Sequence, residues 1–160
     1  MSNIKSTRWN EQALNRLADD FFQLFSRFEY SLKESGYLVP NVKDAIPDWI
    51  RFAEDIHELF EQNDKSEIIN AKRFILEEPP KKQINRDGLI DWDSTPPDSS
   101  NQTDLLLKYI RRIRNNLFHG GKFNGRWFKP DRSGELINAA IIILKGCLEI
   151  SEDVRKAYHS

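Results

Sequence analysis

Hydrophobic residues recur at intervals of three and four along most of this chain, a spacing that places side chains on one face of an α-helix. Phe21, Leu24 and Phe28 illustrate the first such stripe. Gly36 follows it as a stop signal. The stripes predict five helices, over residues 10–35, 49–60, 66–77, 103–118 and 134–157. Residues 137–148 are apolar almost all round, which is typical of a helix deep in a bundle or at a subunit contact.

The helical pattern stops between the third and fourth stripes. Pro79 and Pro80 end the third helix. Residues 79–101 are rich in Pro, Lys, Asp, Asn and Ser, with a small apolar island at residues 89–92. We interpret this segment as a long irregular loop, with one short strand as an option, that is either functional or partly disordered. Because helical patterns continue on both sides of it, the segment is an insertion within one bundle and not a domain boundary.

The length of 160 residues and the hydrophobic content of 39% suit one domain with a single core. The predicted fold class is all-α: an antiparallel bundle of about five helices over residues 1–160, with the insertion between the third and the fourth. The lone Cys147 lies in an apolar run, which favours a buried thiol and a reducing cytosol. Residues 1–9 lack the apolar core of a signal peptide, and the longest apolar run, residues 139–144, is too short to cross a membrane. We therefore expect a cytoplasmic protein without a membrane partner.

The formal net charge of -1 gives the whole chain no attraction to nucleic acid, so phosphate binding requires a local cluster of charge. Residues 108–132 provide one, with a single acid, Asp131, among many basic side chains. The candidate RNA-binding residues are Lys108, Arg111, Arg112, Lys122, Arg126 and Lys129. Aromatic side chains are interleaved with them: Tyr109, Phe118, Phe123, Trp127 and Phe128. This pattern suits capture of a phosphate backbone with stacking on exposed bases; the alternative is that the aromatic rings pack beneath the loop while the cations stay solvated.

Residues 114–119 place a cation, two amides and an imidazole at the end of the fourth predicted helix. Arg114 can hold a phosphate through its planar fork of donors, and His119 can transfer a proton near neutral pH. These are the two functions that metal-free cleavage of RNA requires. Gly120 and Gly121 suit the end of a helix because glycine adopts positive φ without strain.

Helical geometry constrains how these side chains can cooperate. Arg114 and His119 lie about 140° apart on an ideal helix, so only a long arginine reaching round the helix could share a small site with His119. Asn115, four residues before His119, is better aligned with it and could hydrogen-bond it. A symmetric dimer would bring two copies of the motif together across a twofold axis. The spacing therefore favours a homodimer.

An arginine and a histidine separated by four residues, near the end of a late helix in a small helical domain, resemble the signature of the HEPN superfamily. The asparagine directly after the arginine, the two following glycines and residues 25–30 are also similar to that family, nearest its ApeA-like branch. The resemblance covers most of the chain except residues 79–101. It implies an HEPN-like fold and a metal-independent endoribonuclease that works as a homodimer, with the motif in a cleft at the dimer interface. Arg114 and His119 would be catalytic, and Asn115 would support them.

The implied chemistry needs no cofactor. His119 would exchange a proton with the attacking 2′-hydroxyl or the leaving 5′-oxygen, while Arg114 would stabilise charge on the phosphorus oxygens. This route requires the 2′-hydroxyl and leaves a 2′,3′-cyclic phosphate, so DNA should survive. Small ribonucleases of this kind resemble toxins or phage-defence effectors, which adds an antitoxin or regulatory protein to the expected partners.

Other titratable residues are weaker candidates. Glu29 could approach the motif from the first helix and pair with Arg114, or it could be an ordinary solvated or ion-paired residue. His57 is expected at the surface or the core boundary, and His159 near the end of the last helix. The spacing of His, Cys and carboxylate residues fits no metal site, so we predict no structural metal.

Two further interpretations of the motif stay open. One is a binding module that keeps the HEPN scaffold and binds RNA, a nucleotide or a partner protein without turnover. The other is a purely structural dimeric bundle in which Arg114 pairs with an acid and His119 caps its helix. The surrounding basic and aromatic residues favour the nucleic-acid interpretations over the structural one.

Overall fold

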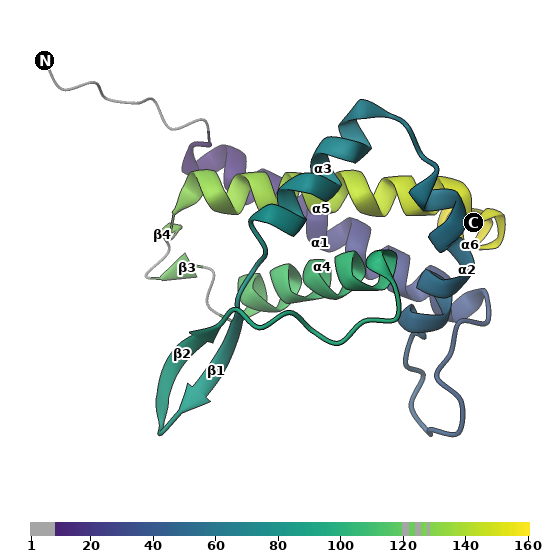
Figure 1. The fold of residues 1–160 in the computed structure, drawn as a ribbon, viewed down its shortest axis with the longest axis horizontal. Helices are drawn as coiled ribbons and strands as arrows, with labels where there is room; N and C mark the ends of the chain where they lie inside the picture. Colours follow the sequence, from purple (N-terminus) through teal and green to yellow (C-terminus); the bar gives the residue numbers. More distant parts are fainter. Residues whose placement is uncertain (1–8, 120–121, 124–125, 128) are drawn as a thin grey trace, which may run out of the picture.

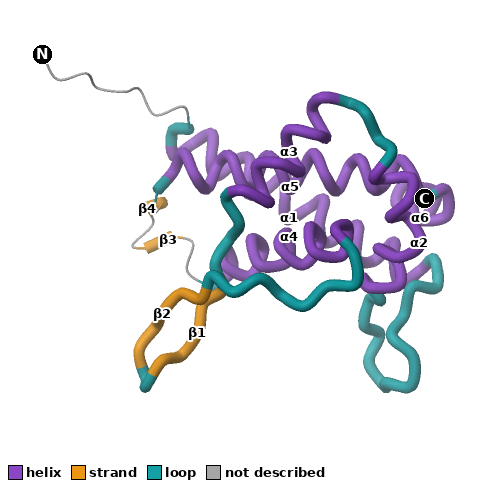
Figure 2. The backbone as a smooth tube through the Cα atoms, viewed as in Figure 1, coloured by secondary structure: helices purple, strands orange, loops and turns teal. Residues whose placement is uncertain are grey.

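Helices make up most of the protein. The structure, a computed structural model, describes residues 9–119, 122–123, 126–127 and 129–160. Its helices are α1 (Glu11–Glu34), α2 (Trp49–Glu61), α3 (Ser66–Glu77), α4 (Gln102–Phe118), α5 (Pro130–Ile150) and α6 (Glu152–His159). Two short antiparallel pairs complete it: β1 (Lys82–Arg86) with β2 (Leu89–Asp93), and β3 (Lys122–Phe123) with β4 (Arg126–Trp127). The predicted mainly helical class is confirmed (Figures 1 and 2).

Side-chain caps fix where several helices begin. The side chains of Asn10 and Asp48 accept hydrogen bonds from the backbone at the first turns of α1 and α2. Asn101 does the same for α4, at 2.7 Å from the amide nitrogen of Asp104. Each cap satisfies a backbone donor that the helix itself leaves unpaired. The starts of α1, α2 and α4 therefore fall within two residues of the predicted ones.

Helix α5 is the centre of the bundle and contacts all five other helices of the described chain. Its buried positions cover about two-thirds of the helix circumference, and Lys145 and Glu149 are exposed on the remaining side. The buried residues are Gly134, Leu136, Ile137, Ala139, Ala140, Ile143, Leu144, Gly146, Cys147 and Leu148. Gly146 allows α3 and α2 to approach closely, since a Cβ there would lie 3.0 Å from Ile68 and 3.3 Å from Phe60. The nearly continuous apolar sequence of residues 137–148 is thus explained by burial within the bundle.

The end of α4 lies beside the first half of α1. Helix α4 runs in the opposite direction to α1 and α5, so it ends where those two helices begin (Figure 1). The rings of Phe118 and Phe22 meet edge to face there, with their centroids 6.3 Å apart. The residues of the opening motif are consequently at one end of the bundle and not in its core.

The final predicted helix is in fact two. The chain breaks at Ser151, whose φ of -93° and ψ of 106° are extended, and α6 then turns back onto α1. Val154 becomes fully buried, and the Tyr158 ring lies 4.7 Å below the guanidinium carbon of Arg27. A serine followed by Glu152 and Asp153 is a helix-start signal within an otherwise helical pattern. The prediction of one continuous helix over residues 134–157 was wrong at this point.

The predicted irregular insertion contains a regular hairpin. Strands β1 and β2 pair in register from Lys82 opposite Asp93 to Arg86 opposite Leu89. Asp87 and Gly88 form the turn, with φ of 54° and 84°. Positive φ at both central residues is the geometry of a two-residue turn whose twist matches that of the strands, and Asp-Gly is a favoured sequence for it. The interpretation of residues 79–101 as a long irregular loop with one short strand as an option was therefore wrong, because two strands pair there.

No helix in the part of the chain that the structure describes is long and apolar enough to cross a lipid bilayer. The longest, α1, is amphipathic, with eight buried positions along one stripe. Its opposite face carries exposed charged side chains such as Arg16, Asp19 and Glu34. The apolar residues of α1 therefore serve the core of the bundle.

Candidate functional site

A basic cavity of about 490 Å³ lies between α4 and the base of the β1–β2 hairpin. Helix α4 supplies most of its wall, β1 supplies two residues and the loop after β2 supplies one. The lining residues are Lys82, Gln83, Pro97, Lys108, Arg111, Arg112, Asn115, Asn116 and His119. None of these described lining residues carries a carboxylate, so the cavity presents cations, amides and an imidazole to whatever enters it.

Helical spacing explains why these side chains share one wall. Arg111, Asn115 and His119 follow one another at intervals of four, which places them in one row along α4. Lys108, Arg112 and Asn116 form a parallel row beside it. The two rows are one residue apart in sequence register, so both face the hairpin. The predicted alignment of Asn115 with His119 agrees with this arrangement.

His119 stands at the exposed C-terminal end of α4. Its backbone N–H donates to the Asn115 carbonyl at 2.9 Å, which closes the last turn of the helix. Its ring is exposed and meets the Phe118 ring edge to face at 5.5 Å between centroids. The imidazole is thus open to solvent and to the cavity, as proton transfer to a bound substrate would require.

Arg114 points to the other side of α4. It does not line the cavity, and its guanidinium carbon lies 5.0 Å from the centroid of the Phe118 ring and 5.8 Å from that of Phe25 on α1. Its Nη1 donates to the Asn115 side-chain oxygen at 3.0 Å. Asn115 therefore connects the arginine to the cavity that contains His119. Within one chain the two motif residues stand on different faces, as their angular separation on a helix predicts.

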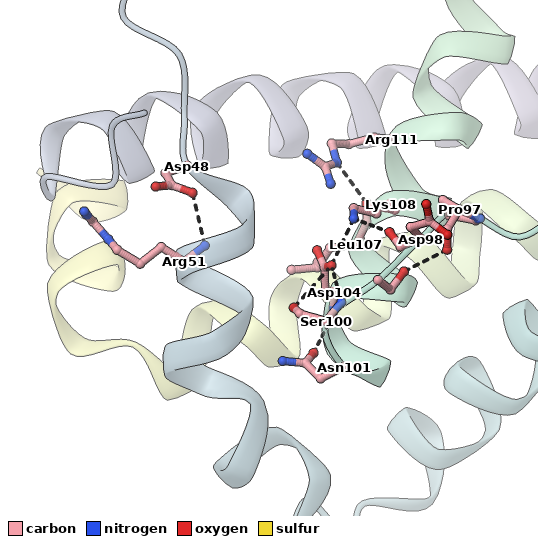
Figure 3. A network of polar contacts seen from close by, with 11 residues as sticks. Asp48, Arg51, Pro97, Asp98, Ser100, Asn101, Asp104, Leu107, Lys108 and Arg111 are labelled. Carbon is pink, nitrogen blue, oxygen red and sulfur yellow. Dashed lines mark hydrogen bonds and ion pairs between the residues drawn. The ribbon is translucent and has the colours of Figure 1, made fainter. Parts of the chain in front are cut away.

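Lys108 and Arg112 already have partners in the protein. Lys108 forms an ion pair of 3.0 Å with the buried Asp104 and also donates to the Asp98 carbonyl (Figure 3). Arg112 donates to the Thr95 carbonyl at 3.0 Å. The sequence offered these two cations as RNA-binding residues, but the structure uses both to hold the loop after β2 against α4.

Arg111 is the least solvated cation of the cavity. Burial lowers the pKa of its guanidinium from the ordinary value, and the charges of Asp104 and Glu29 oppose that shift. Its guanidinium carbon lies 5.4 Å from the centroid of the Trp49 ring. A desolvated cation interacts more strongly with an incoming anion than a solvated one does, so Arg111 is a candidate phosphate ligand on α4.

Glu29 does not pair with Arg114 in the described structure. Its carboxylate accepts a hydrogen bond of 3.1 Å from the Trp49 indole, on the side of α1 nearest Arg111. Glu29 is therefore hydrogen-bonded to Trp49 of α2, whereas Arg114 contacts Asn115 and the Phe118 ring. Glu29 instead supports the surroundings of Arg111.

The remaining candidates divide into described and undescribed side chains. Lys129 is exposed at the start of α5, where its φ is 46°. The side chains of Lys122 and Arg126 lie outside the described residues, as do Gly120 and Gly121. The sequence prediction missed four cavity residues, Lys82, Gln83, Pro97 and Asn116. The signal for the first two was the hairpin turn that follows them, and the signal for Asn116 was its spacing of four from Arg112.

Histidines away from the cavity have structural surroundings. His57 Nδ1 lies 2.8 Å from the hydroxyl oxygen of the buried Thr103, and this contact ties α2 to the start of α4. The ring of His159 packs against Tyr158 at 5.2 Å between centroids. Among the residues that the structure describes, no group of three or more His, Cys, Asp or Glu side chains could hold a metal ion.

No protein-family model, curated protein or solved structure matches this chain. The resemblance to the HEPN superfamily therefore rests on the motif of residues 114–119 and on the helical setting of that motif. Membership of that superfamily stays a prediction.

Proposed function

We propose that this protein is a metal-independent endoribonuclease of HEPN type that works as a homodimer, as a toxin or phage-defence effector. The observation that carries the proposal is the basic cavity beside α4. It places the exposed imidazole of His119, Asn115 one turn before it and the poorly solvated cation of Arg111 about 12 Å away along the helix axis in one row of α4. An RNA strand in that cavity would have a cation for its backbone and a proton-transfer group within this row.

The proposed reaction uses the ribose 2′-hydroxyl as nucleophile. The hydroxyl oxygen forms a bond to phosphorus, the bond to the 5′-oxygen breaks, and the products are a 2′,3′-cyclic phosphate and a free 5′-hydroxyl. His119 exchanges a proton with the attacking 2′-hydroxyl or the leaving 5′-oxygen, and Arg114 binds the phosphorus oxygens as charge develops on them. Because arginine remains charged at physiological pH, a metal ion is not needed for that purpose.

The proposed homodimer would bring together an arginine and a histidine that lie on different faces of α4 within one chain. Arg114 lies outside the cavity of its own chain, beside Phe118, whose side chain is 65% exposed. A twofold contact through this end of α4 would bury the exposed ring. It would also bring Arg114 of each protomer toward His119 of the other. The composite site would then contain the arginine and histidine that the chemistry requires.

Cleavage of single-stranded RNA in excess chelator tests the proposal. The wild-type protein should cleave, and Arg114→Ala and His119→Ala should both lose activity. Arg73→Ala on exposed α3 and His159→Ala should keep it, which controls for loss of any arginine or histidine. Mixing the two inactive variants should restore about a quarter of the activity, because half of the dimers are mixed and each has one intact composite site. No cleavage by the wild type, or cleavage unaffected by either substitution, would refute the proposal.

A second candidate is a module that binds RNA, a nucleotide or a partner protein without cleaving RNA. The contacts of Lys108 and Arg112 with the loop after β2 favour it, because those cations contribute to the architecture of the cavity. Under this alternative, single-stranded RNA binds to the wild type and remains intact. His119→Ala then weakens binding only slightly.

A further inference from the structure

The β1–β2 hairpin carries large apolar side chains that are exposed to solvent and are not buried in the core of the bundle. It extends away from the helices, at the lower left of Figure 1. Leu89 is 75% exposed, Ile90 74% and Trp92 45%. Ile90 and Trp92 share one face of the hairpin, and neighbouring exposed apolar side chains of this size can form an interaction site.

The hairpin is fastened to the wall of the basic cavity at both of its ends. The side-chain nitrogen of Asn116 donates to the Lys81 carbonyl at 2.8 Å, just before β1. Arg112 donates to the Thr95 carbonyl at 3.0 Å, just after β2. Both donors line the cavity. Residues of the cavity therefore hold the hairpin in a defined position beside it.

Strand register places the exposed indole on the same face of the hairpin as one residue of the cavity wall. Trp92 lies directly opposite Gln83, which lines the cavity, so the two side chains share one face of the hairpin. The carboxylates of β2 are on the other face, where Asp91 bonds Arg86 at 2.6 Å and Asp93 accepts from Thr95. The face that carries Trp92 has no carboxylate of its own. The other face brings Asp93 near the cavity, because Asp93 lies opposite Lys82, and hydrogen bonds from Thr95 and then the charge of Arg112 lower the pKa of Asp93.

We propose that Trp92 and Gln83 form a base-binding subsite for single-stranded RNA, with the adjacent phosphate in the basic cavity. An indole that is half exposed beside several cations has the composition of a single-strand binding surface, in which bases stack on aromatic rings and the backbone follows positive charge. The charge pattern selects RNA over a second copy of this chain, whose net charge is -1 and would gain little from the cations. This inference rests on the proposed function for the identity of its ligand and adds the residue that holds the base.

Binding of a fluorescein-labelled single-stranded oligoadenylate, measured by anisotropy, tests this subsite. All proteins carry His119→Ala so that cleavage does not interfere. Trp92→Ala should raise the Kd about 5- to 150-fold, the range expected for loss of one base–aromatic stack. Trp92→Phe should restore most of the affinity. Leu89→Ala is the matched control, because Leu89 is exposed on the opposite face of β2, and it should leave the Kd within about twofold.

The dependence of Kd on salt concentration distinguishes base stacking from phosphate contacts. The slope of log Kd against log salt should stay unchanged in Trp92→Ala, whereas Arg111→Ala should reduce it by about 0.7, the contribution of one phosphate contact on a single strand. A Kd insensitive to Trp92→Ala would overturn the subsite while leaving RNA cleavage intact. Loss of the dimer in Trp92→Ala, measured by light scattering, would also overturn it and would assign the hairpin to subunit contact. Failure of the proposed function looks different, because binding by the His119→Ala protein then depends on Trp92 while the wild-type protein, with His119 intact, never cuts RNA.

Discussion

The substitution Lys108→Met tests whether Lys108 stabilises the fold or binds RNA. The side chain of Asp104 is only 1% exposed and that of Lys108 23% exposed, so the substitution leaves a buried carboxylate without its ion-pair partner. Removing one partner of a buried pair costs about 3–5 kcal/mol. Methionine keeps the unbranched stem of lysine, so little packing is lost with the charge.

The contacts of Asp104 adjust this magnitude. Its Oδ2 keeps hydrogen bonds from the Ser100 backbone at 3.0 Å and hydroxyl at 3.4 Å, which lowers the cost. Its Oδ1 is buried with no hydrogen-bond partner in the described structure, so Arg111 interacts with its charge but makes no hydrogen bond that could replace the lysine. We expect a loss of about 2–3 kcal/mol in the free energy of unfolding. For a chain of this length that corresponds to a fall in Tm of about 4–12 °C.

Urea unfolding followed by circular dichroism measures this loss. Lys65→Met is the matched control, because its ion pair with Glu149 is more than 60% exposed on both sides and should contribute less than about 0.5 kcal/mol. Adding Asp104→Asn to Lys108→Met should recover about 1–2 kcal/mol, since no charge is then left buried. Equal stability of the Lys108 and Lys65 variants, together with weaker RNA binding by the first alone, would refute this reasoning and make Lys108 an RNA ligand.

Three further predictions concern single side chains. Gly88→Ala forces a methyl group into a φ of 84°, so amides of residues 82–93 should exchange faster while those of α5 stay protected; uniform change would contradict it. Burial raises the pKa of the Cys147 thiol, so a disulfide reagent should react only after denaturation, and rapid native labelling would count against this. Burial, then the bond to Asp55, raises the pKa of Tyr37 to about 12. Its contribution to stability should be complete below the unfolded pKa of 10.0 and disappear as pH rises to about 12, a dependence that Tyr37→Phe should lack in urea titrations.

The helical core could be predicted because its signal is local. Phe21, Leu24 and Phe28 lie on one face of α1 wherever that helix packs, and all three are buried. The two misassigned segments also had local signals. Asp87–Gly88 has the sequence of a hairpin turn, and Ser151 before two acids has that of a helix start. The turn signal was outweighed by the polar composition of residues 79–101, and the helix-start signal by the longer helical stripe of residues 134–157.

The candidate site could be predicted only in part, because most of it is assembled by tertiary contacts. The row of Asn115 and His119 follows from helical spacing alone, as does the separation of Arg114 from it. The contact of Lys108 with the Asp98 carbonyl depends on where the chain after β2 returns to α4, and no local sequence pattern predicts that position. The entry of Lys82 and Gln83 into the cavity depends in the same way on how the hairpin is anchored.

The central position of α5 determines when this protein can fold during synthesis. Residues 130–150 are translated after α1, α2, α3 and α4, yet each of those helices packs against them. Until α5 leaves the ribosome, the earlier helices have amphipathic faces and no common partner, so they cannot bury a complete core. The bundle that supports the cavity beside α4 is therefore complete only after residues 130–150 have been translated, and a nascent chain would carry the motif of residues 114–119 before it had a folded site in which to use it.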